Sequence, residues 1–309
     1  MIINIILLII GFVMLIKGAD YFVDGASALA ARLKIPAIII GLTVVAMGTS
    51  APEAAVSITS ALQGSNAIAI GNVIGSNIAN ILLILGLSAC AAKLSVQKNT
   101  FMYEMPFTAF ITLLLCLIGG YFGIISTGAA FGLLVLFVAF LGYLFAISRN
   151  SKDANTEIKN INILKIIIFI ALGLVALIFG SKIAVSASID IARIIGISER
   201  IIGLTIVAFG TSLPELVTSV IAARKGEVDI AIGNIIGSNI FNILFVLGIS
   251  GVILPIPFHS AFLFDGAIAI LAVVMLMLAT LRNRCLNRTA GIIFIAVYVA
   301  YLASLIVGK

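Results

Sequence analysis

The chain has 309 residues, of which 62% are hydrophobic and only 10% charged, with a formal net charge of +6. A water-soluble protein of this length needs a polar surface that this composition cannot supply, and the basic residues lie in short loops, so soluble enzymes and nucleic-acid-binding proteins are excluded. Apolar runs of about twenty residues follow one another to the C-terminus, which is typical of a polytopic helical membrane protein. The predicted fold class is therefore all-α.

Ten transmembrane helices are predicted. In chain order their ranges are 2–31, 36–62, 67–91, 102–120, 124–147, 164–192, 198–223, 229–253, 260–281 and 289–307. The segment 148–160 is the only sizeable polar stretch between them. We therefore expect a first five-helix unit at 1–147, a short cytosolic linker at 148–163 and a second five-helix unit at 164–309.

An internal repeat relates the two units. Residues 41–88 recur at 203–250 with a constant offset of 162, and 29 of the 48 paired positions are identical. Because each unit holds an odd number of spans, the second copy crosses the bilayer in the opposite sense to the first. Inverted repeats are the design of many secondary transporters, whose substrate site lies near the midplane where the repeats meet.

The basic residues predict the orientation in the membrane. With the N-terminus outside, thirteen Lys and Arg residues fall in the inner loops and only three, Arg193, Arg200 and Lys309, on the outer side. Cytoplasmic loops carry an excess of Lys and Arg, so both termini are expected to face outward.

Each repeat carries one carboxylate beside a proline inside an apolar span. Pro52 has no N–H and its ring disrupts the preceding turn, so the helix is expected to break near Gly48 and Ser50. A broken helix at membrane depth exposes backbone carbonyls, which is tolerated only beside protein or a watery cavity. These carbonyls, the nearby hydroxyls and the Glu53 carboxylate are hard oxygens that suit Na⁺ and Ca²⁺. The expected set is Ala46, Thr49, Ser50 and Glu53 in the first repeat, and Ala208, Thr211, Ser212 and Glu215 in the second.

The following span of each repeat supplies a second polar wall. Its side chains are four residues apart and therefore share one helix face: Asn72, Ser76 and Asn80, and Asn234, Ser238 and Asn242. Such residues either join helices or line a site. We expect Ser76, Asn80, Ser238 and Asn242 to line the ion site, because the repeat pairs each of them with a buried glutamate. The glycines at 71, 75, 233 and 237 are instead expected to permit close helix packing.

Two motifs carry a family resemblance. GTSxPE occurs at 48–53 and 210–215, and GNVIGSNIAN at 71–80 is repeated as GNIIGSNIFN at 233–242. The chain resembles the calcium/cation antiporter superfamily, in particular the prokaryotic type of its sodium/calcium exchanger branch. The resemblance implies secondary active exchange of three Na⁺ for one Ca²⁺ by alternating access. It also implies Glu53 and Glu215 as carboxylate ligands, with backbone oxygens from Thr49, Thr211, Ala46 and Ala208, hydroxyls from Ser50, Ser212, Ser76 and Ser238, and Asn80 and Asn242 closing the centre.

One departure from the family pattern bears on ion selectivity. Many members, including potassium-dependent exchangers, have Asp where this chain has Asn242. With Asn at both 80 and 242, the central charge is −2 if both glutamates ionise, which is consistent with K⁺-independent, electrogenic exchange. Members of the proton-coupled branch carry a GNxxE pattern in the third helix. The fifth residue of the pattern in this chain is Gly75 in the first repeat and Gly237 in the second, which does not favour proton coupling. Calcium/proton or other cation/proton antiport and a passive cation channel remain the alternative functions.

The remaining expectations concern partners and location. The chain is expected to act in the cell (plasma) membrane as a multi-pass protein. We expect no enzymatic activity and no cofactor, with Na⁺ and Ca²⁺ as the transported substrates. The lipid bilayer surrounds the chain, and neither nucleic acid nor an obligatory protein partner is expected. The three cysteines lack metal-ligand spacing. His259 is expected in a loop.

Overall fold

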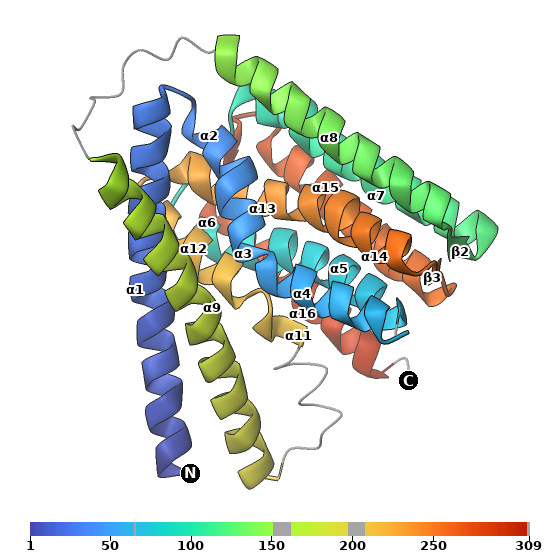
Figure 1. Ribbon diagram of the computed structural model, residues 1–309, viewed down its shortest axis with the longest axis horizontal. Helices are drawn as coiled ribbons and strands as arrows, with labels where there is room; N and C mark the ends of the chain where they lie inside the picture. The colour runs from blue at the N-terminus through green and yellow to red at the C-terminus, as the bar shows by residue number, and fades with distance from the viewer. Residues whose placement is uncertain (65, 151–161, 197–207, 308–309) are drawn as a thin grey trace.

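The computed structural model describes residues 1–64, 66–150, 162–196 and 208–307, which are almost entirely helical (Figure 1). The first half contains α1 (Ile2–Leu33), α2 (Ala37–Ile40), η1 (Gly41–Val45), α3 (Ala46–Thr49), α4 (Ala51–Leu62), α5 (Asn66–Ala79), η2 (Asn80–Leu85), α6 (Gly86–Ala91), η3 (Thr100–Glu104), α7 (Met105–Phe122) and α8 (Thr127–Asn150). The second half contains α9 (Ile163–Ile194), α11 (Ala208–Gly210), α12 (Leu213–Arg224), α13 (Val228–Phe241), η5 (Asn242–Val246), α14 (Leu247–Ile253), α15 (Ala261–Thr280) and α16 (Arg288–Val307). The label η marks π-helical turns.

The helices agree with most of the predicted spans. Within the described residues, eight helical runs are long and apolar enough to cross a membrane, and the bent pair α2–α3 and α4 makes a ninth. The predicted span 198–223 falls partly at 197–207, outside the described residues, and its described remainder forms α11 and α12. The predicted start of the fifth span at 124 is wrong by three residues, because the helix begins at Thr127.

The all-α prediction missed four short strands. β1 (Leu94–Ser95) pairs antiparallel with β4 (Cys285–Leu286), and β2 (Ile124–Ile125) pairs with β3 (Ile256–Pro257). Two residues are too few to give an alternating pattern, so nothing in the sequence distinguishes these strands from loop. Each pair joins a loop of the first half to a loop of the second.

The centre of the molecule is formed by the two GN-motif spans. All residues of α13 from Ile230 to Phe241 are buried, and most of α5 and η2 is buried as well. The predicted close packing is confirmed at α13, because a Cβ on Gly233 would lie 2.8 Å from the Ile38 carbonyl oxygen and one on Gly237 would lie 2.6 Å from that of Leu42. For Gly71 and Gly75 it stays a prediction, because the counterparts of residues 38–42 in the second repeat, 200–204, lie outside the described residues.

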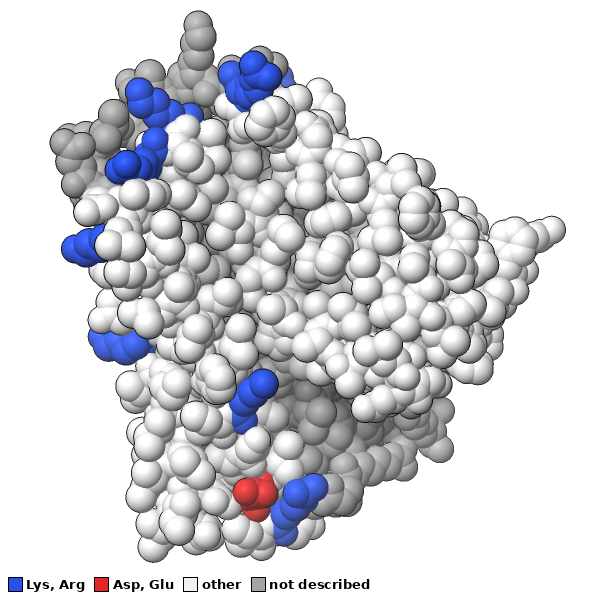
Figure 2. Space-filling model, in the orientation of Figure 1, with Lys and Arg blue, Asp and Glu red and all other residues white. Residues whose placement is uncertain are grey.

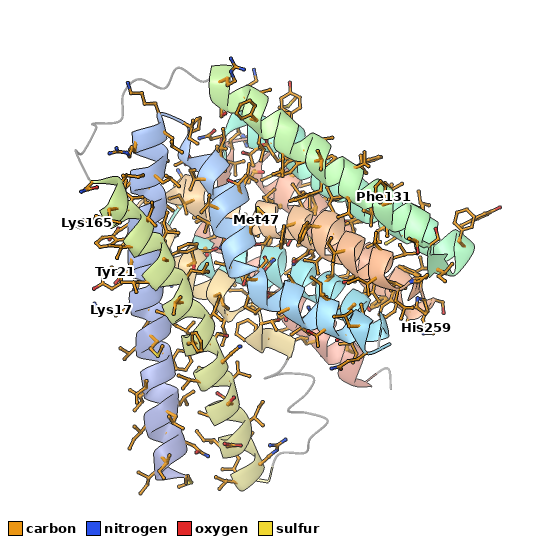
Figure 3. The ribbon with its side chains drawn as sticks, in the orientation of Figure 1. Lys17, Tyr21, Met47, Phe131, Lys165 and His259 are labelled. Carbon is orange, nitrogen blue, oxygen red and sulfur yellow. The ribbon has the colours of Figure 1, made fainter. Side chains whose placement is uncertain are left out.

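The long helices α1 and α9 lie side by side at one edge of the molecule (Figure 1). Glycines form the seam between them: a Cβ on Gly18 would lie 2.9 Å from the Gly173 carbonyl oxygen, and one on Gly11 would lie 2.9 Å from that of Gly180. The two contacts run in opposite chain directions, so the pair is antiparallel. Tyr21, labelled in Figure 3, contacts Phe169 across the same seam, with ring centroids 5.3 Å apart and the rings tilted by 59°.

A group of polar contacts ties α1 to the turn between α12 and α13. Lys225 Nζ lies 2.8 Å from Asp24 Oδ1 and 3.2 Å from Asp20 Oδ1, and Ser27 Oγ donates to Glu227 Oε1 at 2.7 Å. Burial lowers the pKa of Lys225, but its bonds to Asp24 and Asp20 more than offset this and hold that pKa above its usual value. We call these contacts the α1 clasp. The repeat-related positions are Lys182, Ser186, Gln63 and Ser65, which cannot form the same ion pairs.

The surface is that of a membrane protein. In Figure 2, Lys and Arg gather mainly along the upper and left margins, and most of the visible face carries no charged side chain. Large apolar side chains are exposed along the outer helices, as Phe131 is on α8 (Figure 3). Since soluble proteins rarely expose apolar surface of this extent, the chain is a multi-pass membrane protein.

The glycine seam gives a testable expectation. Gly18→Leu should lower the free energy of unfolding by about 1–3 kcal/mol, because the side chain must displace the α9 backbone. Gly142→Leu is the matched control, since Gly142 lies on α8 with no neighbour within 4 Å of the added Cβ. Thermal unfolding in one detergent measures both. Equal unfolding temperatures for the two variants would contradict the close packing.

Candidate functional site

The site begins at two matching helix breaks. α3 and α4 meet at Ser50 with a bend of 50°, and Ser50 has φ −79° and ψ 6°. Ser212, which precedes α12, has nearly the same backbone angles, φ −87° and ψ 6°. In both copies the proline lies in the first turn of the following helix, where its missing N–H is tolerated. The predicted break at Ser50 is therefore confirmed, and Ser212 repeats its geometry.

The two breaks bring the glutamates together across the repeats. Ser50 Oγ donates to Glu215 Oε1 at 2.8 Å, and Ser212 Oγ donates to Glu53 Oε1 at 3.0 Å. Each serine therefore holds the carboxylate of the other repeat. Both glutamates are 1% exposed and stand in the first turn of α4 or α12. The N-terminal end of each helix dipole stabilises negative charge there.

Asparagines fix the glutamate helices to the GN-motif helices. Asn72 Nδ2 donates to the Glu53 backbone oxygen at 3.3 Å and to Ser57 Oγ at 3.0 Å. The second repeat has the same clamp: Asn234 Nδ2 donates to the Glu215 backbone oxygen at 3.4 Å and to Ser219 Oγ at 2.9 Å. The NH₂ groups of Asn72 and Asn234 therefore hold α4 and α12 against α5 and α13 by hydrogen bonds to backbone and serine oxygens.

A ring of four amides joins α5–η2 to α13–η5 at the centre. Asn77 Nδ2 donates to the Asn239 backbone oxygen at 3.1 Å, and Asn239 Nδ2 donates to that of Asn77 at 3.2 Å. The oxygens of these two side chains then accept from the others: Asn80 Nδ2 donates to Asn239 Oδ1 at 2.9 Å, and Asn242 Nδ2 donates to Asn77 Oδ1 at 3.1 Å.

This ring fixes which end of each amide is free. A backbone carbonyl can only accept, so Asn77 and Asn239 must direct their NH₂ groups to each other's carbonyls. Their side-chain oxygens then need donors, which Asn80 and Asn242 supply with their own NH₂ groups. The Oδ1 atoms of Asn80 and Asn242 are consequently left free of the ring as acceptors.

Five buried oxygens of the predicted site residues have no hydrogen-bond partner of acceptable geometry, although the Thr211 side chain approaches Glu53. They are Glu53 Oε2, Glu215 Oε2, Asn80 Oδ1, Asn242 Oδ1 and Thr211 Oγ1. Unpaired buried acceptors are costly in protein interiors, at about 1–3 kcal/mol each and more when charged. When the glutamates are ionised, the two Oε2 and the two Oδ1 atoms have no proton to donate and can act only as acceptors. A cation is the partner that satisfies several such oxygens at once.

The other predicted residues surround this group. Ser238 Oγ lies 3.4 Å from the Ala46 carbonyl oxygen, and Ser76 Oγ lies 3.4 Å from Ser212 Oγ. The Thr49 hydroxyl can donate its one proton either to Asn234 Oδ1, at 2.9 Å, or to the Val45 carbonyl oxygen, at 3.1 Å, and its lone pairs remain available as acceptors. Ala208 begins α11. The π-helical turns η2 and η5 begin at Asn80 and Asn242, and such turns occur frequently at functional sites.

A cavity of about 610 Å³ leads toward the site between α4, α9 and α11. It is lined by Pro52 and Thr59 on α4, Ser181 and Lys182 on α9, and Thr211 beside the break, among others. Because the Thr211 side chain also approaches Glu53, the cavity adjoins the site.

Sequence reasoning missed Asn77 and Asn239. Both belong to the quoted motifs, but they directly follow Ser76 and Ser238 and so lie off the face defined by the four-residue spacing. Their matching positions in the two repeats were the signal that could have revealed them. His259 is exposed at the far end of the molecule, as expected of a loop residue (Figure 3). Among the described residues, no three His, Cys, Asp or Glu side chains converge as a metal site.

Two carboxylates and neutral oxygens, buried between repeated broken helices, define a membrane cation transporter. Residues 3–146 and 165–307 match the model of the sodium/calcium exchanger protein family, and the chain belongs to this family of membrane antiporters.

Full-length relatives agree with this assignment. The sodium/calcium exchanger MaX1 of Methanosarcina acetivorans is 36% identical over 98% of both chains. The inner membrane protein YrbG of Escherichia coli is 35% identical over 97% of this chain and 95% of its own. The solved sodium-calcium exchanger NCX_Mj, soaked with Na⁺ and Ca²⁺, superimposes with a TM-score of 0.86 at 31% identity, covering 99% of both chains.

The amide ring predicts a role for a residue that touches neither glutamate. Asn77→Ala leaves the Asn242 NH₂ group without its acceptor, so the Asn242 amide loses its fixed orientation and Ca²⁺ affinity should fall about tenfold, equivalent to about 1.4 kcal/mol. Calorimetric titration of the purified protein measures the affinity. Thr112→Ala is the control, since the buried Thr112 hydroxyl bonds only the Thr108 carbonyl of its own helix. Unchanged Ca²⁺ affinity in Asn77→Ala would contradict the orienting role.

Proposed function

We propose that the chain exchanges Na⁺ for Ca²⁺ across the membrane at a site whose carboxylates are Glu53 and Glu215. The observation that carries the proposal is the set of buried oxygens without donors on the two glutamates, which the serines join across the repeats, and on the two asparagines of the amide ring. Ca²⁺ takes six to eight oxygen ligands, and Na⁺ is likewise a hard cation that prefers oxygen. The remaining ligands are the serine hydroxyls and the backbone oxygens of Ala46, Thr49, Ala208 and Thr211.

The transport cycle is alternating access between two inverted five-helix repeats, ten spans in all. Support comes from the constant offset of 162 residues and from contacts that are exchanged between the repeats, such as Ser50 with Glu215 and Ser212 with Glu53. With both breaks at one site, each repeat can adopt the conformation of the other, opening the site first to one side and then to the other.

The exchange is electrogenic and independent of K⁺. The charges of Glu53 and Glu215 sum to −2, which one Ca²⁺ neutralises and three Na⁺ exceed by one. Asn242 adds no further charge for K⁺ to balance, and its NH₂ group is committed to Asn77. An aspartate at this position would present an oxygen to the Asn77 oxygen unless it carried a proton.

Both termini face outward in this proposal, and no cofactor or protein partner is required. In Figure 1 the end of α8 and the start of α9 lie on the opposite side of the molecule from the two chain ends. An even number of spans therefore fits, and the excess of basic residues in the loops on the linker side assigns that side to the cytosol of the plasma membrane.

Flux measurements in proteoliposomes test the function. We expect ⁴⁵Ca²⁺ uptake driven by an outward Na⁺ gradient, accelerated by a membrane potential of the sign that favours net charge movement, and unchanged when K⁺ is omitted. Uptake that persists with a proton gradient alone would indicate proton coupling. Uptake without any opposing gradient of cations would indicate a channel.

The charge of the site gives a direct mutational test. Glu53→Gln or Glu215→Gln keeps the shape of the side chain and removes one charge, so Ca²⁺ exchange should fall at least a hundredfold because a site of charge −1 cannot neutralise a divalent ion. Asp265→Asn is the control, since Asp265 is a membrane-embedded carboxylate bonded to Tyr301 on the neighbouring helix α16. Near-normal ⁴⁵Ca²⁺ exchange in either glutamine variant would show that these glutamates are not the ligands.

The α1–α9 pair is expected to slide as a unit over the core during the cycle. Cysteines at Ser27 and Glu227, joined by a short crosslinker, fix α1 to the core and should abolish exchange. Cysteines at Tyr21 and Phe169 join α1 only to α9 and should leave it intact. Flux is compared before and after crosslinking. Full activity with α1 fixed to the core would refute the sliding movement.

A further inference from the structure

A second cavity lies between η3–α7 and α8. Its volume is about 470 Å³, within the range of small-molecule pockets. Its walls are apolar and aromatic: Tyr103, Phe107 and Phe110 from one side, and Leu136, Phe140 and Tyr143 from the other. Tyr103 and Phe110 are more than half exposed on the outer surface, so the cavity opens toward the lipid.

One carboxylate borders this apolar cavity. Glu104 is 3% exposed, and its Oε1 accepts a hydrogen bond of 2.7 Å from the Tyr143 hydroxyl. Thr100 approaches from one turn earlier, yet Glu104 Oε2 has no hydrogen-bond partner of acceptable geometry. A carboxylate in a membrane-embedded helix is expensive unless it has a partner or a function. The transport site does not use Glu104.

The aromatic residues suit a cation beside this carboxylate. The rings of Phe140 and Tyr143 stack with centroids 6.2 Å apart, Phe107 stacks on Phe140 at 5.6 Å, and Tyr103 meets Tyr143 edge-on at 6.3 Å. Aromatic faces attract organic ammonium groups through their quadrupoles. The unpartnered Oε2 can accept a hydrogen bond from the N–H of a primary or secondary ammonium, whereas a quaternary ammonium has no N–H to donate.

The depth of Glu104 narrows the choice of ligand. Glu104 lies four residues into a helical run that begins at Thr100, about 6 Å along the axis. The basic residues Lys98 and Arg149 lie near the ends of these helices, where such side chains are expected at the level of the lipid headgroups. An amine joined directly to a hydrophobic body is therefore better suited to the depth of Glu104 than an ammonium that is attached to a phosphate.

We propose that this cavity binds a hydrophobic amine that enters from the bilayer, with its ammonium group on Glu104 and its apolar body between α7 and α8. The inference is independent of the exchange function. Glu104 also borders a smaller cavity that is lined by Pro36, Ile38 and Leu42. A bound amine therefore lies next to the segment that leads to the broken helix of the ion site.

Equilibrium binding of radiolabelled dodecylamine tests the proposal. The full chain in phosphatidylcholine nanodiscs, corrected for empty nanodiscs, should bind one amine saturably, and Glu104→Gln should weaken binding at least tenfold. Dodecanol carries the same tail without a charge and should bind wild type and Glu104→Gln equally weakly. Dodecyltrimethylammonium carries the charge but has no N–H, so it should bind wild type more weakly than dodecylamine does. Asp265→Asn, which alters the carboxylate–tyrosine pair of α15 and α16, should bind the amine as wild type does.

A second variant tests the cavity without touching the carboxylate. Ala139 lines the cavity from α8, so Ala139→Phe should fill it and abolish amine binding while Glu104 and Tyr143 remain. Equal binding by wild type and both variants would mean partition into lipid only and would overturn the proposal. Displacement of the amine by added phosphatidylethanolamine would overturn the choice of a free amine, since the occupant would then be a lipid headgroup.

Discussion

The structure depends on two carboxylates that are buried at the centre of the protein. Glu53 and Glu215 are each 1% exposed, and charges in such surroundings require compensation by donors, dipoles or counter-ions. Each carboxylate receives one serine hydroxyl and the N-terminal end of a helix, which satisfies only part of its capacity. This incomplete hydrogen bonding is suited to transport. If protein donors satisfied both carboxylates completely, a cation would gain little by binding to them.

The surrounding helices are built to hold these oxygens in place. The prolines break two helices where the glutamates begin, the asparagine clamps fix the glutamate helices, and the amide ring directs two side-chain oxygens away from its own donors. Close glycine packing of α13 against η1 draws the first break toward the second repeat. The periphery is less symmetric than the centre, because the α1 clasp has no ion-paired counterpart at Lys182 and Gln63. The two ends of the transport path are thus chemically unequal although they share one site.

Much of this arrangement follows from the sequence. The repeat, the break at Ser50 and the polar face of the GN-motif helices were predictable because proline chemistry and helical spacing act over a few residues. The pairing of Ser50 with Glu215 was not, since it depends on how two distant segments pack. Asn77 and Asn239 were missed because their role exists only across the interface between repeats. The short strands and the Glu104–Tyr143 pair escaped prediction because their partners are remote in the chain and local patterns around them read as loop or apolar helix.

The central claim is that a cation binds between Glu53 and Glu215. Anomalous diffraction from crystals soaked in Ca²⁺ tests it most directly. We expect one strong Ca²⁺ peak with both carboxylates at about 2.3–2.6 Å and with the free oxygens of this site as its nearest neighbours. A site without a peak at saturating Ca²⁺, or a single peak elsewhere, for example at Asp20 and Asp24, would contradict it.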